Sequence, residues 1–154
     1  MFLSLAVFGT TANPLSKRKP GKVVSVRLVL SKILGSPDGY TRYILAVNGQ
    51  SPGPIISTNP GDTLKVVVTN NLADPTSIHW HGILQTGTNA MDGASGVTQK
   101  PIAPGATFTY QFVTDAPGTY WYHAHVGAQY VDGIRGALIV GGDPSDAVIQ
   151  LSDW

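Results

Sequence analysis

The four histidines of the chain fall into two pairs, and one residue separates the members of each pair. The pairs are His79 with His81 and His123 with His125. In an extended strand, residues i and i+2 point to the same face and lie roughly 6.5 Å apart, at about 3.3 Å of rise per residue. Each pair therefore presents two imidazoles at a spacing that suits one metal ion or two neighbouring ions. If the two strands are neighbours at the same end of the fold, all four rings converge on one pocket.

The residue types indicate which metal these histidines would bind. The chain has no cysteine, so disulfides, zinc thiolates and thiol nucleophiles are excluded within it. Imidazole binds Cu, Zn, Fe and Ni, and a cluster without thiolate or carboxylate favours copper while leaving zinc open. Histidines that merely filled core or surface positions would be scattered along the chain. We therefore interpret His79, His81, His123 and His125 as metal ligands and predict copper as the cofactor.

Short alternating stretches separated by turns surround the histidine pairs. The 18 glycines and 11 prolines favour turns over long helices, and no stretch of ten residues has helical periodicity. About seven or eight short strands at this spacing predict a single all-β domain, an antiparallel sandwich or barrel. The expected strands start at Val23 and continue with 40–47, 54–57, 63–70, 77–84, 107–113, 119–125 and 136–140.

Aromatic residues flank the histidines on both expected strands. Trp80 lies between two ligands and would face away from the metal, because alternate residues of a strand point to opposite faces. On the second strand, Tyr120 and Tyr122 alternate with Trp121 and His123. We interpret these aromatic residues as core packing, with an electron path as the alternative.

The chain divides into three parts by composition. Residues 1–20 form an N-terminal stub, in which 1–12 is a short apolar run typical of a signal peptide but without a basic start, so that a truncated N-terminus is the alternative. Residues 21–142 form the β domain. Residues 143–154 begin with a turn, and the strand expected at 147–151 would start a linker to a missing second domain. A signal peptide would make the protein secreted.

Charge and hydropathy restrict the partners. The formal net charge is +1 and only 12% of the residues are charged, so nucleic acid is not an expected partner. No apolar run approaches the roughly 18 residues that a membrane-spanning helix needs.

Several motifs together are similar to the N-terminal plastocyanin-like domain of multicopper oxidases, which has a Greek-key β-sandwich of cupredoxin type. The stretch from His123 to Val140 resembles laccases and ferroxidase-like relatives of fungal type. The resemblance covers about residues 22–154 and rests on VNGQSPGP from Val47, NPGDTL from Asn59, HWHG from His79, MDG from Met91, QKPI from Gln99 and GTYWYHAH from Gly118.

The resemblance implies a role for each histidine. His79 corresponds to a ligand of the single type 2 copper, and His81, His123 and His125 correspond to ligands of the paired type 3 coppers. In the family these ions bind dioxygen and reduce it to water, while phenolic or similar one-electron donors are oxidised. Asp92, in the MDG motif, resembles an acid that assists proton delivery; an ordinary Asp-Gly turn is the alternative reading.

Departures from the family pattern leave three hypotheses. The other cluster histidines and the cysteine-containing type 1 site belong to later cupredoxin domains, so the isolated chain is expected to be inactive as an oxidase. Lys100 and Val131 also stand where fungal-type laccases usually have cysteines. The leading hypothesis is one domain of a laccase-like oxidase. The second is a stand-alone copper-binding module, and the third is a zinc-binding or purely structural sandwich.

Overall fold

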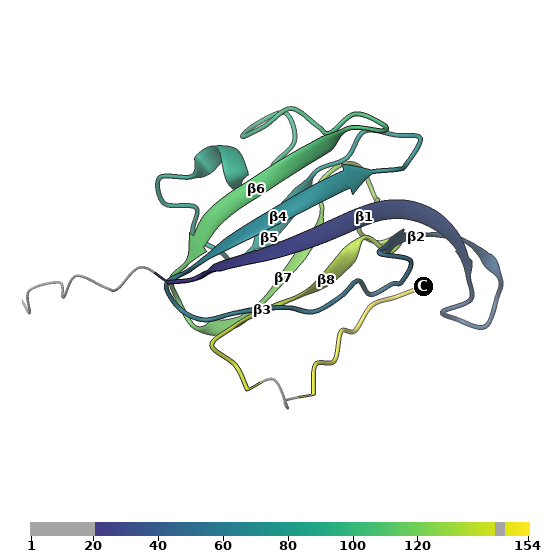
Figure 1. The fold of residues 1–154 in the computed structure, drawn as a ribbon. Helices are drawn as coiled ribbons and strands as arrows, with labels where there is room; N and C mark the ends of the chain where they lie inside the picture. The colour runs from purple at the N-terminus through teal and green to yellow at the C-terminus, as the bar shows by residue number, and fades with distance from the viewer. Residues whose placement is uncertain (1–20, 144–146) are drawn as a thin grey trace, which may run out of the picture.

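Two β-sheets packed face to face make up the domain (Figure 1). The computed structural model describes residues 21–143 and 147–154. Within these residues eight strands form two sheets of four strands each. The predicted all-β sandwich of seven or eight strands is therefore confirmed, but the sheets are mixed rather than antiparallel throughout, since two of the strand pairs are parallel. The signal peptide predicted at 1–12 lies outside the described residues.

The first sheet has the strand order β2-β1-β4-β6. Strands β1 and β4 run parallel, whereas the β1–β2 and β4–β6 pairs are antiparallel. One face of this sheet is apolar because alternate residues of β4 and β6 point inward. The strands are β1 (Val23–Gly35), β2 (Arg42–Val47), β4 (Asp62–Asn70) and β6 (Thr107–Thr114).

The second sheet has the order β3-β8-β7-β5 and carries the histidines. Strand β3 runs parallel to β8, and the other neighbours are antiparallel. The strands are β3 (Ile56–Thr58), β5 (Ile78–His81), β7 (Gly118–Ala124) and β8 (Arg135–Val140).

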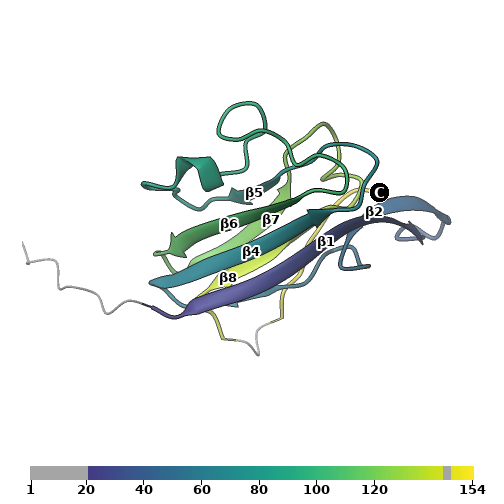
Figure 2. The same cartoon turned by 45° about the horizontal axis from the view of Figure 1, so that its top comes forward.

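The loop between β5 and β6 is the longest loop that connects two consecutive strands. It contains the one helical turn of the described residues. This turn is the short 3-10 helix η1 (Asn89–Met91). Figure 2 shows it in a group of loops beside the end of β6. The connection continues from η1 into the MDG motif, so it brings Asp92 close to the strand that carries the first histidine pair.

The core between the sheets fixes the direction of the first histidine pair. Trp80 is fully buried, with its ring 5.1 to 6.0 Å from the rings of Tyr110, Phe112 and Tyr122. Since neighbouring strand residues point to opposite faces, the burial of Trp80 turns His79 and His81 to the outer face of the sheet. The prediction that Trp80 faces away from the histidine site is confirmed.

The strand predicted at 147–151 is wrong. Residues 147–154 have no strand conformation and instead lie over the outer face of the second sheet, where they line hollows together with residues of β7 and β8. Both edges of β8 are already paired, with β3 and β7, so no backbone partner is left there. Ile149 and Leu151 are 80% and 91% exposed, so the apolar alternation that suggested a strand buries almost nothing.

Replacing Trp80 with alanine should lower the free energy of unfolding by about 3–5 kcal/mol, because it leaves a large cavity in the core. Chemical denaturation followed by circular dichroism measures the loss. Tyr43→Ala is the control, since Tyr43 is 65% exposed and its removal should change stability by about 0.5 kcal/mol or less. Equal effects of the two substitutions would contradict the buried position of Trp80.

Candidate metal centre

The pairing of β5 with β7 brings the two histidine pairs together. The strands are antiparallel, and their register places His79 opposite His123 and His81 opposite Trp121. Residues directly opposite each other in neighbouring strands point to the same face of the sheet. The four imidazoles and the Trp121 indole therefore gather on the outer face of the second sheet.

The distances between the rings show this convergence. The His79 ring lies 5.6 Å from that of His81, 5.4 Å from that of His123 and 5.3 Å from that of His125, measured between centroids. His125 follows the last residue of β7, and its backbone N–H donates to the carbonyl of Ser77 at 3.0 Å. This bond holds His125 beside β5 although it is outside the regular strand. The convergence expected from the two His-x-His pairs is therefore present, and it includes all four histidines.

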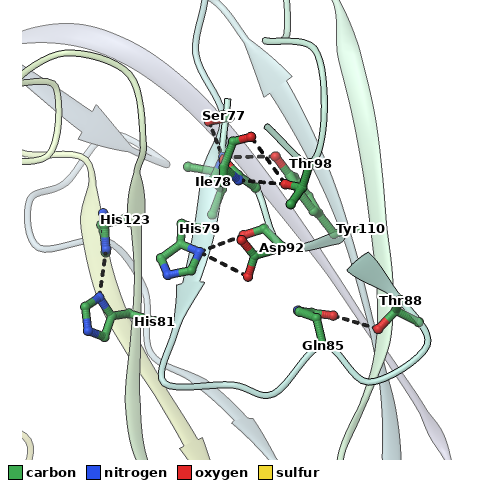
Figure 3. Close-up of polar contacts among 12 residues, drawn as sticks. Ser77, Ile78, His79, His81, Gln85, Thr88, Asp92, Thr98, Tyr110 and His123 are labelled. Atoms are coloured by element: carbon green, nitrogen blue, oxygen red, sulfur yellow. Dashed lines mark hydrogen bonds and ion pairs between the residues drawn. The ribbon is translucent and has the colours of Figure 1, made fainter. Parts of the chain in front are cut away.

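Three of the histidines have ligand atoms at a spacing that suits a metal. One ring nitrogen from each of His79, His81 and His123 lies within 4.8 Å of the other two. The His81 Nδ1 and His123 Nε2 atoms are 3.3 Å apart (Figure 3). Because metal–imidazole bonds are about 2.0–2.1 Å long, one ion can contact both atoms. His125 lies outside this group of three.

Two rings are oriented by hydrogen bonds to backbone carbonyls. The Nδ1–H of His79 donates to the carbonyl of Asp92 at 2.7 Å (Figure 3). The Nδ1–H of His123 donates to the carbonyl of Ala124 at 2.9 Å. Such a bond fixes the tautomer and leaves the lone pair on Nε2, as in metal-binding histidines generally. Each of these two rings thus has one nitrogen ready to bind a metal.

Burial keeps His123 neutral. The removal of the ring from solvent, together with a smaller effect of the neighbouring histidines, lowers the pKa of His123 to about 4, against the opposing effect of the bond to Ala124. At neutral pH the ring is therefore unprotonated. A metal ion binds only the neutral imidazole, so this environment favours metal binding over protonation.

Asp92 lies beside the histidine site. It caps the C-terminal end of η1, and its carboxylate Oδ1 is 3.5 Å from Nδ1 of His79. The shorter contact to His79 is made by the backbone carbonyl of Asp92. Asp92 also lines a separate surface hollow with Leu84, Gln85, Thr86, Asn89 and Thr98. Asp92 therefore lies in a turn, where it is close to His79 and also reaches solvent.

Gly93 attaches the MDG motif to β5. Its carbonyl accepts a hydrogen bond from the hydroxyl of Ser77 at 2.7 Å. Its φ is +84°, and a Cβ at this position would lie 1.8 Å from the carbonyl oxygen of Ile78. Only glycine fits this conformation so close to another backbone. This close approach holds the Asp92 carbonyl at His79.

Sequence reasoning misread or missed three residues at the site. Trp121 is not part of the buried core, so its interpretation as core packing is wrong; its ring lies 4.1 Å from that of His123. The ring of Tyr130 lies 5.4 Å from that of His123. Arg135 is the cross-strand partner of His123. The alternation of Trp121 with His123 signalled a shared face, whereas the positions of Tyr130 and Arg135 depend on tertiary pairing.

Arg135 connects the loop beside His123 to the end of the chain. It is 5% exposed, and its Nη1 donates to the carbonyl of Tyr130 at 2.9 Å. Its Nη2 donates to the hydroxyl of Ser152 at 2.6 Å, and its guanidinium lies 4.7 Å from the centre of the Trp154 ring. Burial lowers the pKa of Arg135, but so basic a group keeps its charge at neutral pH.

The donor set is suited to copper. The hollow at the site is lined by the four histidines together with Trp121, Ala124, Gly127 and Tyr130, so within residues 21–143 and 147–154 no carboxylate lines it. His81 and His125 are exposed to solvent, and the hollow is open on that side. Imidazole rings in which one nitrogen makes an orienting hydrogen bond and the other is free fit copper. Zinc accepts the same ligands.

Comparison with known proteins identifies the family. The family model described as "Multicopper oxidase" matches residues 30–145. The chain belongs to the multicopper oxidase family. This membership implies copper as the cofactor, in agreement with the imidazole cluster, and makes the chain part of a family of oxidoreductases.

Several of the relatives and solved structures that this multicopper oxidase domain matches are fungal laccases. It is 46% identical to Laccase-1 of Cryptococcus neoformans over 136 residues, which are 81% of the chain and 22% of the relative. It is 51% identical to Laccase-2 of Botryotinia fuckeliana over 126 residues, covering 77% of the chain and 22% of the relative. The crystal structure of the laccase from Botrytis aclada matches with a TM-score of 0.78 and 49% identity, over 80% of the chain and 23% of the laccase.

These matches confirm the cupredoxin-type β-sandwich predicted for the chain. The multicopper oxidase domain spans less than a quarter of the length of these laccases. Among the described residues, no helix has both the length and the apolar character needed to cross a membrane.

Gly93→Ala should destabilise the multicopper oxidase domain by at least about 2 kcal/mol, because the new methyl group meets the Ile78 carbonyl and the φ is positive. Gly96→Ala is the matched control, since its φ is +77° and no atom lies within 4 Å of the added Cβ. Its cost should be limited to about 1–2 kcal/mol of backbone strain. Urea denaturation measures both, and a smaller loss for Gly93→Ala would refute the close approach.

Proposed function

We propose that the chain provides half of the histidine ligands of a trinuclear copper cluster in a laccase-like oxidase. The complete enzyme would reduce dioxygen to water and oxidise phenolic or similar one-electron donors. The observation that supports this proposal is the convergence of four imidazoles, with His81 Nδ1 and His123 Nε2 at 3.3 Å, in a domain of this family.

The roles of the histidines differ within the proposal. His79 would hold the type 2 copper, and His81, His123 and His125 would hold the type 3 pair. The central position of His79 supports this division, since its ring lies 5.3–5.6 Å from each of the other three. The short separation between His81 and His123 supports a shared ion for these two.

Asp92 would supply protons to the reaction. Reduction of one dioxygen to two waters takes four electrons and four protons, and copper supplies the one-electron redox chemistry when it is bound. The Asp92 carboxylate lies 3.5 Å from Nδ1 of His79 on one side and lines a solvent-facing hollow on the other. A carboxyl group in this position can take a proton from solvent and pass it toward the dioxygen site.

The other half of the cluster would come from a later cupredoxin domain. Four imidazoles cannot satisfy three coppers at two or three nitrogens each, and the hollow is open where further ligands could approach. We propose residues 21–142 as the first cupredoxin domain and 143–154 as the start of a linker to the second. In the same proposal, 1–20 is an N-terminal stub with a signal peptide at 1–12, and the protein is secreted.

Copper titration of the purified chain tests the half-site. The wild-type chain should bind Cu(II) and Cu(I), and His81→Ala, His123→Ala and His125→Ala should each weaken binding by tenfold or more, because each removes a ligand. Isothermal titration calorimetry measures the affinities. Asn89→Ala is a control near Asp92 that leaves the imidazoles intact. Binding no tighter than that of a surface histidine pair, or unchanged in the alanine variants, would contradict the proposal.

The copper-loaded chain alone should be nearly colourless and should not oxidise phenols. The chain contains no cysteine, so it cannot form the copper–thiolate bond that gives a type 1 site its intense visible band. Absorption spectroscopy and an oxygen electrode check both expectations. Phenol oxidation by the pure chain would show that the cluster needs no second domain. Tight copper binding without a completing domain anywhere in the same gene would favour the stand-alone copper module instead.

A further inference from the structure

We propose that Trp121 is a positioning residue that fixes the ring planes of His81 and His123 for metal binding. The inference rests on the proposed metal site and assigns a function to an indole that sequence reasoning placed in the core. Trp121 would act on the ligands through stacking and would not bind the metal itself.

Trp121 stacks on two of the four histidines. Its ring centroid is 4.1 Å from that of His123 and 5.0 Å from that of His81, and the interplanar angle is 29° in both pairs. The His81 and His123 rings are inclined to each other by 43°. One indole therefore sets the planes of the two rings whose nitrogens are 3.3 Å apart.

His81 depends on this contact more than the other stacked ring. His123 and His79 are each held by a hydrogen bond from Nδ1 to a backbone carbonyl. His81 has no such bond: in the described part of the chain, its ring makes a polar contact only through Nδ1, toward His123. Stacking on Trp121 therefore replaces the hydrogen bond that usually orients a metal-binding histidine.

The position of the Trp121 indole is itself restrained by its neighbours. Trp121 lies in β7, which is paired on both sides, with His81 and Ala137 as its cross-strand partners. The Tyr130 ring lies 6.3 Å from it, measured between centroids, at an interplanar angle of 66°. Arg135 in turn holds the Tyr130 carbonyl. A side chain held in this way loses little additional freedom when it orders its neighbours.

Ring orientation matters because the torsion that turns an imidazole about its Cβ–Cγ bond is broad. A ring that rotates freely presents Nδ1 to the site for only part of the time. The conformational entropy of the ring is then lost when the metal binds, and this loss raises the dissociation constant. Because the stacked indole already restricts the ring in the metal-free chain, little of this entropy remains to be lost on binding.

The first test uses the metal-free wild-type chain and needs no variant. NMR relaxation of the imidazole carbons measures the order of each ring. The proposal expects the His81 ring to be as ordered as that of His123 and to show contacts to Trp121 protons. A His81 ring that is mobile in the metal-free chain would overturn the proposal, whether or not copper binds.

The second test compares two substitutions at one position. Trp121→Leu should weaken Cu(II) binding about tenfold, because it removes the stacking surface, whereas Trp121→Phe should retain affinity within about threefold. Phe108→Leu is the matched control: it removes a partly buried ring from the other sheet, and its affinity should equal that of the wild type. Calorimetry measures affinity, and circular dichroism confirms folding.

The outcomes separate this inference from the proposed function. If wild-type copper affinity is unaffected by the histidine substitutions, the proposed metal site fails, while ring order still tests the action of Trp121. If the histidine variants lose copper and a folded Trp121→Leu binds as tightly as the wild type, the site stands and the positioning role is wrong. Equal losses in Trp121→Leu, Trp121→Phe and Phe108→Leu would also reject it, since they would indicate a general loss of stability.

Discussion

The antiparallel pairing of β5 with β7 is the interaction on which the rest of the site depends. Its register sets His79 directly opposite His123, and β8 continues the same face with Arg135. A shift by one residue would turn every side chain of β5 to the other face, so that Trp80 would leave the core and the histidines would enter it. The same strand register therefore both buries the Trp80 indole and brings the imidazoles together.

The face that carries the histidines is organised by backbone carbonyls and aromatic rings rather than by charge. The carbonyls of Asp92 and Ala124 orient the imidazoles of His79 and His123. The indole of Trp121 stacks on the imidazoles of His81 and His123. In the described part of the chain, the residues that line the hollow include no acidic side chain, so imidazole is the metal-binding group found there. The Asp92 carboxylate lies just outside it, 3.5 Å from Nδ1 of His79.

The fold and the convergence of the candidate ligands could be predicted from the sequence to a large extent. The alternation in β4 and β6 and the turn residues between strands identified an all-β sandwich, and the His-x-His spacing identified a shared face. The prediction failed at 147–151, where the chain lies beside β8, a strand that is already paired on both edges. It also failed for Trp121, because an aromatic residue in a strand has the same local pattern in a core and beside a metal site.

The sequence by itself determined which residues can bind metal and which face of its own strand each one shares, because these properties depend on residue type and on a period of two. Tertiary structure alone decided that the two pairs meet, that Asp92 reaches His79 from a distant loop, and that Tyr130 and Arg135 stand beside His123. These contacts join residues far apart in the chain. Their positions follow from strand order and register, which no local pattern encodes.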